Sequence, residues 1–345
     1  MRAAVFYGPE DIRFEDVADP ELEPGGLVIA TAATGICGSD LRTYRFGHPK
    51  ISGSQILGHE VAGVIEQSDV AELPVGTPVA VAPGTPCLEC SYCRRGKQNM
   101  CIKRTILGRE HPGGLAEKFG VSAQAVRAGT VAVVPDSVHL RHAPVAESLN
   151  AVLNGQDRGQ IGAYDRVIVL GLGPIGILHI ATARARGAEL VVGADPLGSR
   201  VESAAGILGE RELITMEAGW EQKALALTEN DGFDVVILAN TAPRAFDTAM
   251  QLIAPQGRVL VFAGLPKDSP TVAANLNDIH YKEISLVGAF GATPRHFRAA
   301  VKWLGEGHLN LDKFVTSEIP LESVVEGFEA VGRGEGVKTM VVFSG

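Results

Sequence analysis

The sequence predicts an α/β protein of two domains, one β-rich and the other a doubly wound parallel sheet covered by helices. The first observation is length, because 345 residues exceed the roughly 250–300 residues at which single hydrophobic cores stop growing. The second is that short apolar runs before Val134 are broken by Gly and Pro, which is typical of a barrel or sandwich. The third is that strand-like and helix-like patterns alternate from about Ala151 onward, as they do in parallel sheets.

Composition excludes several classes of protein. The chain is 46% apolar and 21% charged, which is ordinary for a globular protein. A net charge of −9 without a long basic run argues against a nucleic-acid partner. The N-terminus lacks the apolar core of a signal peptide. The uncharged stretch Val167–Ala183 contains glycines and Pro174 and is shorter than the roughly 20 residues of a membrane helix. We therefore expect a soluble cytoplasmic protein that binds neither membranes nor nucleic acid.

The first domain, up to residue 151, contains short strand-like segments. The clearest are Arg2–Phe6, Leu27–Thr34, Glu60–Glu66, Thr77–Ala82 and Thr130–Val134. Their spacing and the turn residues between them favour a partly closed barrel or a sandwich.

All five cysteines lie in the first third of the chain, and an odd count favours metal binding or catalysis over disulfides. Four of them have the spacing C-x2-C-x2-C-x7-C, which strongly indicates a closed tetrahedral zinc site. These four are Cys87, Cys90, Cys93 and Cys101. A redox or disulfide role is the alternative. Basic residues beside them would offset the excess negative charge of four thiolates, namely Arg94, Arg95, Lys97, Lys103 and Arg104.

A second group of candidate metal ligands lies in two glycine-rich motifs. Cys37 is in GICGSD, residues 35–40, and His59 is in GHEVAG, residues 58–63. Glu60 follows directly, and Glu147 lies further along the chain. Three protein ligands with one open position are typical of a catalytic zinc. Alone, His59 would be read as a hydrogen-bonded core histidine, but its pairing with Cys37 favours a ligand.

The stretch VIVLGLGPIG, residues 167–176, predicts a dinucleotide-binding turn. Four apolar residues of a buried strand lead into three glycines spaced G-x-G-x-x-G, and a helical pattern follows. Such a turn presents the helix N-terminus to a pyrophosphate. The turn residues are Gly171, Leu172, Gly173, Pro174, Ile175 and Gly176. Glycines at a packed turn without a ligand are the alternative.

The acidic end of the next strand indicates which dinucleotide binds. The strand Leu190–Asp195 ends 24 positions after Gly171, where a ribose-binding carboxylate is expected. Asp195 would accept hydrogen bonds from the ribose of NAD and repel the 2′-phosphate of NADP. Arg200 lies five residues further on and is able to receive that phosphate, so NADP is the alternative.

The second domain is expected to hold six strands and four crossover helices. The strands are Arg166–Leu170, Leu190–Asp195, Arg211–Ile214, Phe233–Asn240, Gly257–Gly264 and Ile284–Gly288, and the helices are Ile175–Arg186, Ser199–Leu208, Trp220–Thr228 and Arg244–Ile253. The chain then returns to the first domain with helices Pro294–Gly305 and Leu321–Val331 and strand Lys338–Phe343. This gives one domain from residues 1–151 and 289–345 and another from 152–288.

These motifs, in this order, resemble the zinc-dependent medium-chain alcohol dehydrogenases over essentially the whole chain, with the polyol (sorbitol-like) branch nearest. The resemblance implies a GroES-like catalytic domain, a Rossmann NAD-binding domain and a homodimer or homotetramer. It also implies hydride transfer between NAD and a secondary alcohol, such as a polyol, cyclitol or sugar alcohol. Zinc lowers the pKa of a bound hydroxyl group for this purpose.

The resemblance assigns roles to individual residues. Cys37 and His59 match the ligands of the catalytic zinc, and either Glu60 or Glu147 completes the set, with Glu147 slightly preferred. Ser39 matches the hydroxyl group that accepts the alcohol proton. Asp40 matches a carboxylate that orients the ligand histidine. The four-cysteine zinc is structural in this family.

One position departs from the family pattern. Many relatives have a histidine three residues after the serine, where this chain has Arg42. A guanidinium group with a pKa above about 12 does not shuttle protons near neutrality, so water or another role for Arg42 is required. A threonine-3-dehydrogenase-like or phosphorylated-polyol enzyme is the alternative within this chemistry. A non-catalytic dinucleotide-binding protein is the alternative of a different class.

Overall fold

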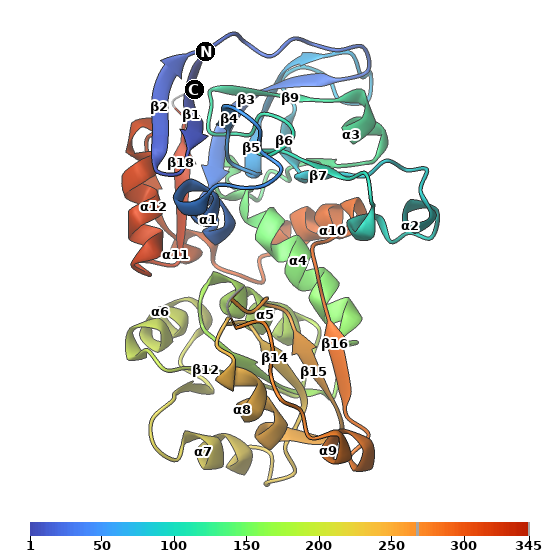
Figure 1. Ribbon diagram of the computed structural model, residues 1–345, viewed down its shortest axis with the longest axis vertical. Coiled ribbons are helices and arrows are strands. Elements are labelled where there is room, and N and C mark those ends of the chain that lie inside the picture. Colours follow the sequence, from blue (N-terminus) through green and yellow to red (C-terminus); the bar gives the residue numbers. More distant parts are fainter. Residues whose placement is uncertain (267–268, 344–345) are drawn as a thin grey trace. The chain divides into compact units, whose positions relative to one another are not determined.

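The computed structural model describes residues 1–266 and 269–343, which form two compact units (Figure 1). The first unit comprises Met1–Asn150, Ala292–Gly307 and Leu311–Gly345, and the second comprises Ala151–Gly291 and His308–Asn310. Among the described residues, none of the helices combines the length and apolarity that a membrane crossing requires.

The first unit is built on sheets whose strands pair antiparallel, apart from the parallel pair of β17 and β18. Its largest sheet has the order β10-β6-β5-β3-β18-β17, with β9 also paired to β3. These strands are β3 (Leu27–Gly35), β5 (Glu60–Ser68), β6 (Pro78–Val81), β9 (Lys118–Val121), β10 (Val131–Val133), β17 (Val315–Ile319) and β18 (Lys338–Val342). Smaller sheets pair β1 (Arg2–Gly8) with β2 (Asp11–Asp16) and β4 (Gln55–Ile56), and β7 (Gly84–Thr85) with β8 (Thr105–Ile106).

Short helices connect and cover these strands. They are α1 (Gly38–Phe46), α2 (Ser91–Arg94), α3 (Ala123–Arg127), α10 (Pro294–Gly305), α11 (Leu311–Phe314) and α12 (Val324–Gly332), with 3₁₀ turns at Gln98–Met100, Leu140–His142 and Leu321–Ser323. The longer helix α4 (Val145–Arg158) begins in the first unit and ends in the second. The predicted helix Pro294–Gly305 is confirmed, and its capping box at Thr293 explains where it starts.

Strand β3 is the element around which the first candidate site forms. It pairs with β5 through Gly35 and Glu60, and with β18 through Gly35 and Met340. The last strand of the described chain therefore lies beside the end of β3, where the GICGSD motif begins.

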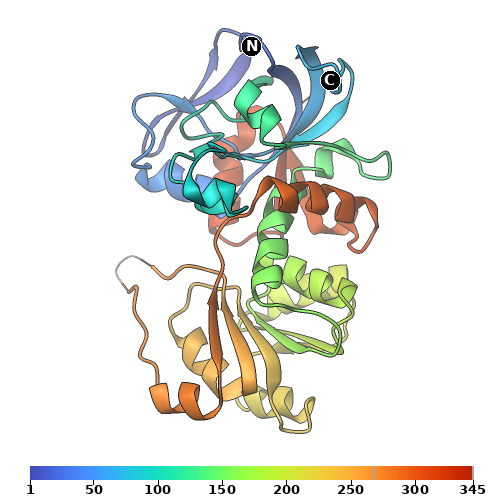
Figure 2. The ribbon, with the colours of Figure 1, turned by 90° about the vertical axis from the view of Figure 1, so that its right-hand side faces the viewer.

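The second unit is a parallel sheet with helices on both sides (Figure 2). Within the described residues its six strands have the order β13-β12-β11-β14-β15-β16, and every pairing is parallel. The strands are β11 (Arg166–Leu170), β12 (Leu190–Asp195), β13 (Leu213–Thr215), β14 (Phe233–Leu238), β15 (Ile253–Val261) and β16 (Ser285–Gly288). The helices are α5 (Pro174–Ala185), α6 (Gly198–Leu208), α7 (Trp220–Ala226), α8 (Arg244–Leu252) and α9 (Leu276–Tyr281). The predicted doubly wound sheet is confirmed.

The predicted bounds of this sheet differ most at β15, while those of β13, β14 and β16 differ by one or two residues. We expect a helix to end at Ile253 and a strand to start at Gly257, whereas β15 already starts at Ile253. Its pairing with β14 shifts register after Phe233, because the segment around Gly257 is accommodated as an irregularity in the strand.

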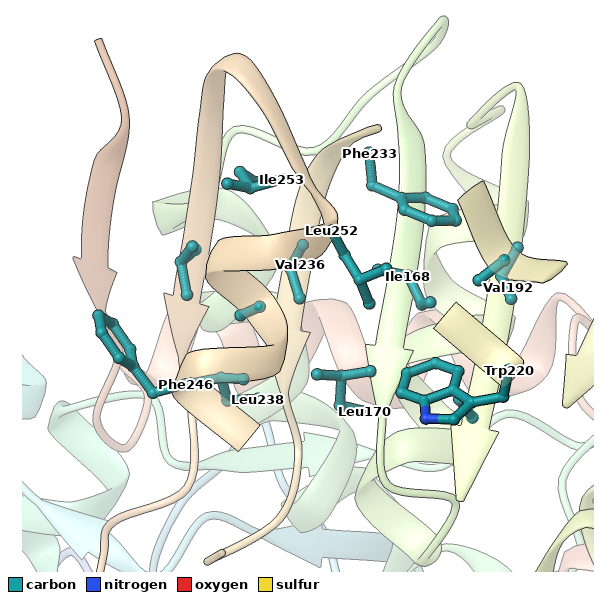
Figure 3. Close-up of a cluster of buried hydrophobic side chains, with 14 of the residues drawn as sticks. Ile168, Leu170, Val192, Trp220, Phe233, Val236, Leu238, Phe246, Leu252 and Ile253 are labelled. Atoms are coloured by element: carbon teal, nitrogen blue, oxygen red, sulfur yellow. The ribbon is translucent and has the colours of Figure 1, made fainter. Parts of the chain in front are cut away.

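A buried cluster of apolar side chains fixes the sheet of the second unit (Figure 3). Ile168 and Leu170 on β11 lie next to Val236 on β14, and α8 contributes Leu252. Because these strands are covered on both faces, their sequences are almost continuously apolar. This packing holds the end of β11, from which the glycine turn starts.

Candidate functional site

Three candidate metal ligands of the first unit lie together. The ligand atoms of Cys37, His59 and Glu60 are all within 4.8 Å of one another. Cys37 is the N-cap residue of α1, two residues after the end of β3, and His59 directly precedes β5. The pairing of β3 with β5 therefore brings the two predicted motifs to one point.

A carboxylate orients the histidine of this group. Nδ1 of His59 lies 2.9 Å from Oδ1 of Asp40, and both residues are buried. Burial acts to lower the pKa of His59, but the charge and hydrogen bond of Asp40, together with Cys37, raise it well above its usual value. With Nδ1 engaged by Asp40, Nε2 is the ring nitrogen left for a metal, which is the arrangement common in metal sites.

The Glu60 carboxylate is held from several sides. Its Oε1 accepts a hydrogen bond of 3.1 Å from Ser148 Oγ, and its Oε2 forms a buried ion pair with Lys338 Nζ. A side chain on Gly35 would place its Cβ 2.1 Å from Oε2, so only glycine leaves room for the carboxylate there. We missed Gly35, Ser148 and Lys338 as site residues. Of these three, only Gly35 had a signal in the sequence, because it is the first residue of the GICGSD motif.

Glu147, the second candidate carboxylate, does not belong to the group of mutually close ligand atoms. It lies in the first turn of α4. Burial of its carboxyl group, opposed by His59 and reinforced by the Glu60 charge, raises the pKa of Glu147 to about 7. The structure thus brings Glu60 closest to Cys37 and His59, with Glu147 near enough to interact electrostatically with His59 and Glu60.

The remaining predicted residues of this site lie on α1. Ser39 Oγ donates a hydrogen bond of 3.5 Å to Cys37 Sγ, so its hydroxyl group is beside the candidate metal ligands. Arg42 follows one turn later on the same helix and is exposed.

The four other cysteines form a separate cluster. Their sulfur atoms all lie within 4.8 Å of one another, and all are free thiols. The Sγ atoms of Cys87 and Cys93 are 3.9 Å apart, which matches the roughly 3.8 Å between sulfurs in a tetrahedral zinc site with bonds of about 2.3 Å. The backbone N–H of Cys93 lowers the pKa of Cys90 to about 6, which favours a thiolate at that position, whereas burial raises the pKa of Cys93 to about 12. These observations fit a zinc ion held by four thiolates.

The glycine turn of the second unit joins β11 to α5. Gly171 has a φ of 111°, and a Cβ on Gly176 would lie 1.8 Å from the carbonyl oxygen of Gly171. The turn therefore depends on glycine at both positions. Gly173 is the N-cap residue of the twelve-residue helix α5, and Pro174 occupies its first position. Leu172 and Ile175 complete the turn, and the unpaired N–H groups at this helix start are suited to a diphosphate.

Asp195 connects the end of β12 to this turn. It is 1% exposed, its Oδ2 accepts a 2.8 Å hydrogen bond from Leu172 N, and its Oδ1 accepts one of 2.9 Å from Leu197 N. Each carboxylate oxygen has a second lone pair, so the group is able to accept from a ribose as well. Arg200 Nη1 lies 3.7 Å from Oδ2.

Comparisons with known proteins agree with this geometry. Residues 23–136 match the family model "Alcohol dehydrogenase GroES-like domain", and residues 174–306 match "Zinc-binding dehydrogenase". The chain is 31% identical to erythritol/L-threitol dehydrogenase of Mycolicibacterium smegmatis, over 99% of this chain and 97% of the relative. It is 30% identical to L-threonine 3-dehydrogenase of Pyrococcus horikoshii, again over 99% and 97%. An alcohol dehydrogenase of Escherichia coli CFT073, solved with NADH, is 25% identical with a TM-score of 0.88 and 99% of both chains covered.

Proposed function

The chain belongs to the zinc-dependent medium-chain alcohol dehydrogenase family, and on this premise we propose that it transfers a hydride between a secondary alcohol and NAD. The proposed substrate is a polyol, a cyclitol or a related sugar alcohol. The observation that carries the proposal is the group formed by Cys37, His59 and Glu60, whose ligand atoms lie within 4.8 Å of one another.

This group fits a catalytic zinc. Thiolate, imidazole and carboxylate are the ligands that zinc prefers, and three of them leave one position for substrate. Gly35 leaves the space that the Glu60 carboxylate fills. When bound, zinc supplies Lewis acidity toward the hydroxyl group of the alcohol, and NAD supplies the hydride acceptor.

The residues of the chain position this chemistry. Asp40 holds the His59 ring so that Nε2 is the ligand atom. We assign to the Ser39 hydroxyl group, beside Cys37, the role of accepting the substrate proton and passing it to water. Arg42 does not take part in this transfer, because its guanidinium group stays charged.

We propose NAD as the cofactor, bound through the glycine turn and Asp195. The proposal is supported by the helix N-terminus at Gly173 and by the carboxylate of Asp195 next to that turn. A relative of the same fold binds NADH. Arg200 lies 3.7 Å from Asp195 and is able to bind the 2′-phosphate of NADP. Activity with NADP is therefore the comparison that tests the choice of NAD.

The second candidate substrate is an amino alcohol with a carboxylate, such as threonine. It is favoured by the similarity to L-threonine 3-dehydrogenase and by the exposed cation Arg42 on α1, which would bind an anionic group. A phosphorylated polyol has the same requirement. The similarity to the erythritol/L-threitol enzyme favours a neutral polyol.

The test is a substrate panel with the zinc-loaded protein. Four- to six-carbon polyols, cyclitols, phosphorylated sugar alcohols and L-threonine are each incubated with NAD or NADP, and reduced cofactor is followed by absorbance. We expect turnover of neutral polyols with NAD and its loss in Cys37→Ser. Turnover of anionic substrates only, lost in Arg42→Ala, would favour the second candidate. No reduction of either cofactor with any alcohol would contradict the proposal.

We also propose the roles of the two domains, the cellular compartment and the oligomeric state. Residues 1–151 and 289–345 form the GroES-like catalytic domain, and residues 152–288 form the Rossmann NAD-binding domain. The free cysteines support a reducing compartment, and we place the protein in the cytoplasm. The edge strand β16, which among the described strands pairs only with β15, supports a homodimer or homotetramer.

A further inference from the structure

A buried lysine lies beside the candidate catalytic zinc site. Lys338 is 4% exposed and its ion-pair partner Glu60 is 0% exposed. Lys338 Nζ also donates a hydrogen bond of 3.1 Å to the carbonyl oxygen of Ile36, the residue before Cys37. Burying a lysine this completely costs free energy unless it is paired and hydrogen-bonded. The burial of Lys338 is therefore stabilised by its ion pair with Glu60.

The Glu60 carboxylate has two competing cationic partners. It belongs to the group of ligand atoms with Cys37 and His59, and its Oε2 is paired with Lys338. Zinc with one thiolate, one imidazole and one carboxylate is formally neutral. Adding the carboxylates of both Glu60 and Glu147 makes the site negative and weakens its Lewis acidity. The charge of Lys338 restores neutrality.

We propose that Lys338 is a positioning residue that competes with the metal for the Glu60 carboxylate and so keeps the ion Lewis-acidic. Its ammonium group holds Oε2 from the side of β18, while Ser148 holds Oε1 from α4. Both contacts restrain the carboxylate in the space that Gly35 leaves free. Glu60 thereby shares its negative charge between Lys338 and the metal that it helps to hold. This inference rests on the proposed zinc site.

The test measures how tightly the zinc of this site is held when the charge is removed. Lys338→Met holoenzyme is equilibrated with increasing chelator, and zinc per chain is determined by mass spectrometry. Cys37→Ser keeps the four-cysteine cluster, so it shows at which chelator concentration the zinc of that cluster is released. We expect Lys338→Met to retain its zinc to a chelator concentration at least about tenfold higher than the wild type, because a cation is removed and a carboxylate is freed. Its kcat should fall.

If Lys338 only supported the structure, its replacement would weaken zinc binding instead of tightening it. Loss of a residue that supports metal ligands usually weakens metal binding about 10–100-fold. Weaker or unchanged zinc retention would overturn the inference. Lys338→Gln, which keeps a donor for the Ile36 carbonyl, should behave like Lys338→Met and replaces it if that variant does not fold. Lys338→Arg keeps the charge and should retain zinc like the wild type.

A double variant tests whether the effect passes through Glu60. In a Glu60→Gln background, Lys338→Met removes only the direct repulsion between the ammonium group and the metal, so the tightening should be clearly smaller than in the wild-type background. Tightening of the same size in both backgrounds would overturn the proposed competition. Wild-type protein with about two zinc ions per chain and Cys37→Ser with about one confirm the premise. A wild type with only about one would overturn both this inference and the proposed function.

Discussion

Several residues of the candidate site act by holding other residues in place. Asp40 fixes the ring of His59 through a 2.9 Å contact, and Ser148 and Lys338 restrain Glu60. Such partners orient metal ligands and tune the ion that they bind. The residues next to the reacting alcohol are then few, and Ser39 is the one to which we assign proton transfer.

Replacing Ser39 tests that assignment. Ser39→Ala should lower kcat by about 10²–10⁴-fold, the range typical of general acid–base groups, with unchanged zinc content. Ser39→Thr keeps the hydroxyl group and should retain most of the activity. Steady-state kinetics with the best polyol and metal analysis give the two readouts. Equal activity of Ser39→Ala and the wild type would remove Ser39 from the mechanism.

His179 makes the stability of the second unit depend on pH. It is 0% exposed on α5, and burial lowers its pKa to about 3. The unfolded chain protonates this ring near its ordinary pKa of about 6.5, whereas the folded chain does not. Its contribution to stability is therefore fully present above about pH 6.5 and is lost as the pH falls toward 3, by about 1.4 kcal/mol per pH unit.

His179→Leu removes the titrating group from this buried position. Between about pH 7 and pH 5, the free energy of unfolding should fall by about 2 kcal/mol less in this variant than in the wild type. Urea unfolding at both pH values measures the difference, and His280→Leu on the exposed surface is the control. Identical pH dependence in His179→Leu and the wild type would contradict the assignment.

At the scale of elements, both candidate sites form where a strand passes into a helix. Cys37 lies between β3 and α1, and the glycine turn lies between β11 and α5. A strand fixes the direction of the chain, and the helix that follows offers its positive N-terminal end. The glycine turn has the stricter sequence requirement of the two, because a Cβ on Gly176 would meet the backbone carbonyl oxygen of Gly171.

A single methyl group tests the glycine turn. In Gly176→Ala the new Cβ would lie 1.8 Å from the Gly171 carbonyl oxygen. Overpacking of about 1–3 kcal/mol should weaken NADH binding by about 10–100-fold. Gly198→Ala is the matched control, because a Cβ at Gly198 meets nothing within 4 Å. Fluorescence titration with NADH compares the two, and equal affinities would contradict the assigned role of the turn.

Elements with a strong local pattern could be predicted from the sequence, and weaker ones could not. Strands β11 and β12 and helix α10 have the predicted bounds, because buried apolar runs and capping signals define them. Strand β2 (Asp11–Asp16) was missed although Ile12 and Phe14 alternate with charged residues and pack against a core cluster, because two apolar residues make a very short pattern. Helix α4, which carries Glu147, is not among the predicted elements, although Val145, Leu149 and Val152 recur at helical spacing and are buried.

At the scale of the whole chain, the first unit contains both early and late segments of the sequence. This explains why Lys338 could not be predicted as a site residue. Its neighbour Ile36 is 302 positions away in sequence, and only the pairing of β18 with β3 brings them together. Cys37, His59 and the four-cysteine cluster have local motifs, whereas Lys338 on β18 and Ser148 on α4 reach Glu60 only through tertiary contacts.

The proposed homo-oligomer should depend on the edge of the second sheet. Leu286 on β16 is 46% exposed, and an edge strand offers unpaired backbone groups to a second copy. We expect Leu286→Lys to shift the protein toward the monomer in light scattering after size-exclusion chromatography. Leu227→Lys, at a 45% exposed residue after α7, is the control and should not. A monomeric wild type would contradict the proposed assembly.

The central claim is that Cys37, His59 and Glu60 hold a zinc ion distinct from that of the four cysteines. Anomalous X-ray scattering at the zinc edge, on crystals of the zinc-loaded protein, tests it most directly. We predict two anomalous peaks, one enclosed by Cys87, Cys90, Cys93 and Cys101 and one between Cys37 Sγ and His59 Nε2. A single peak at the four cysteines, with none beside Cys37, would contradict the account.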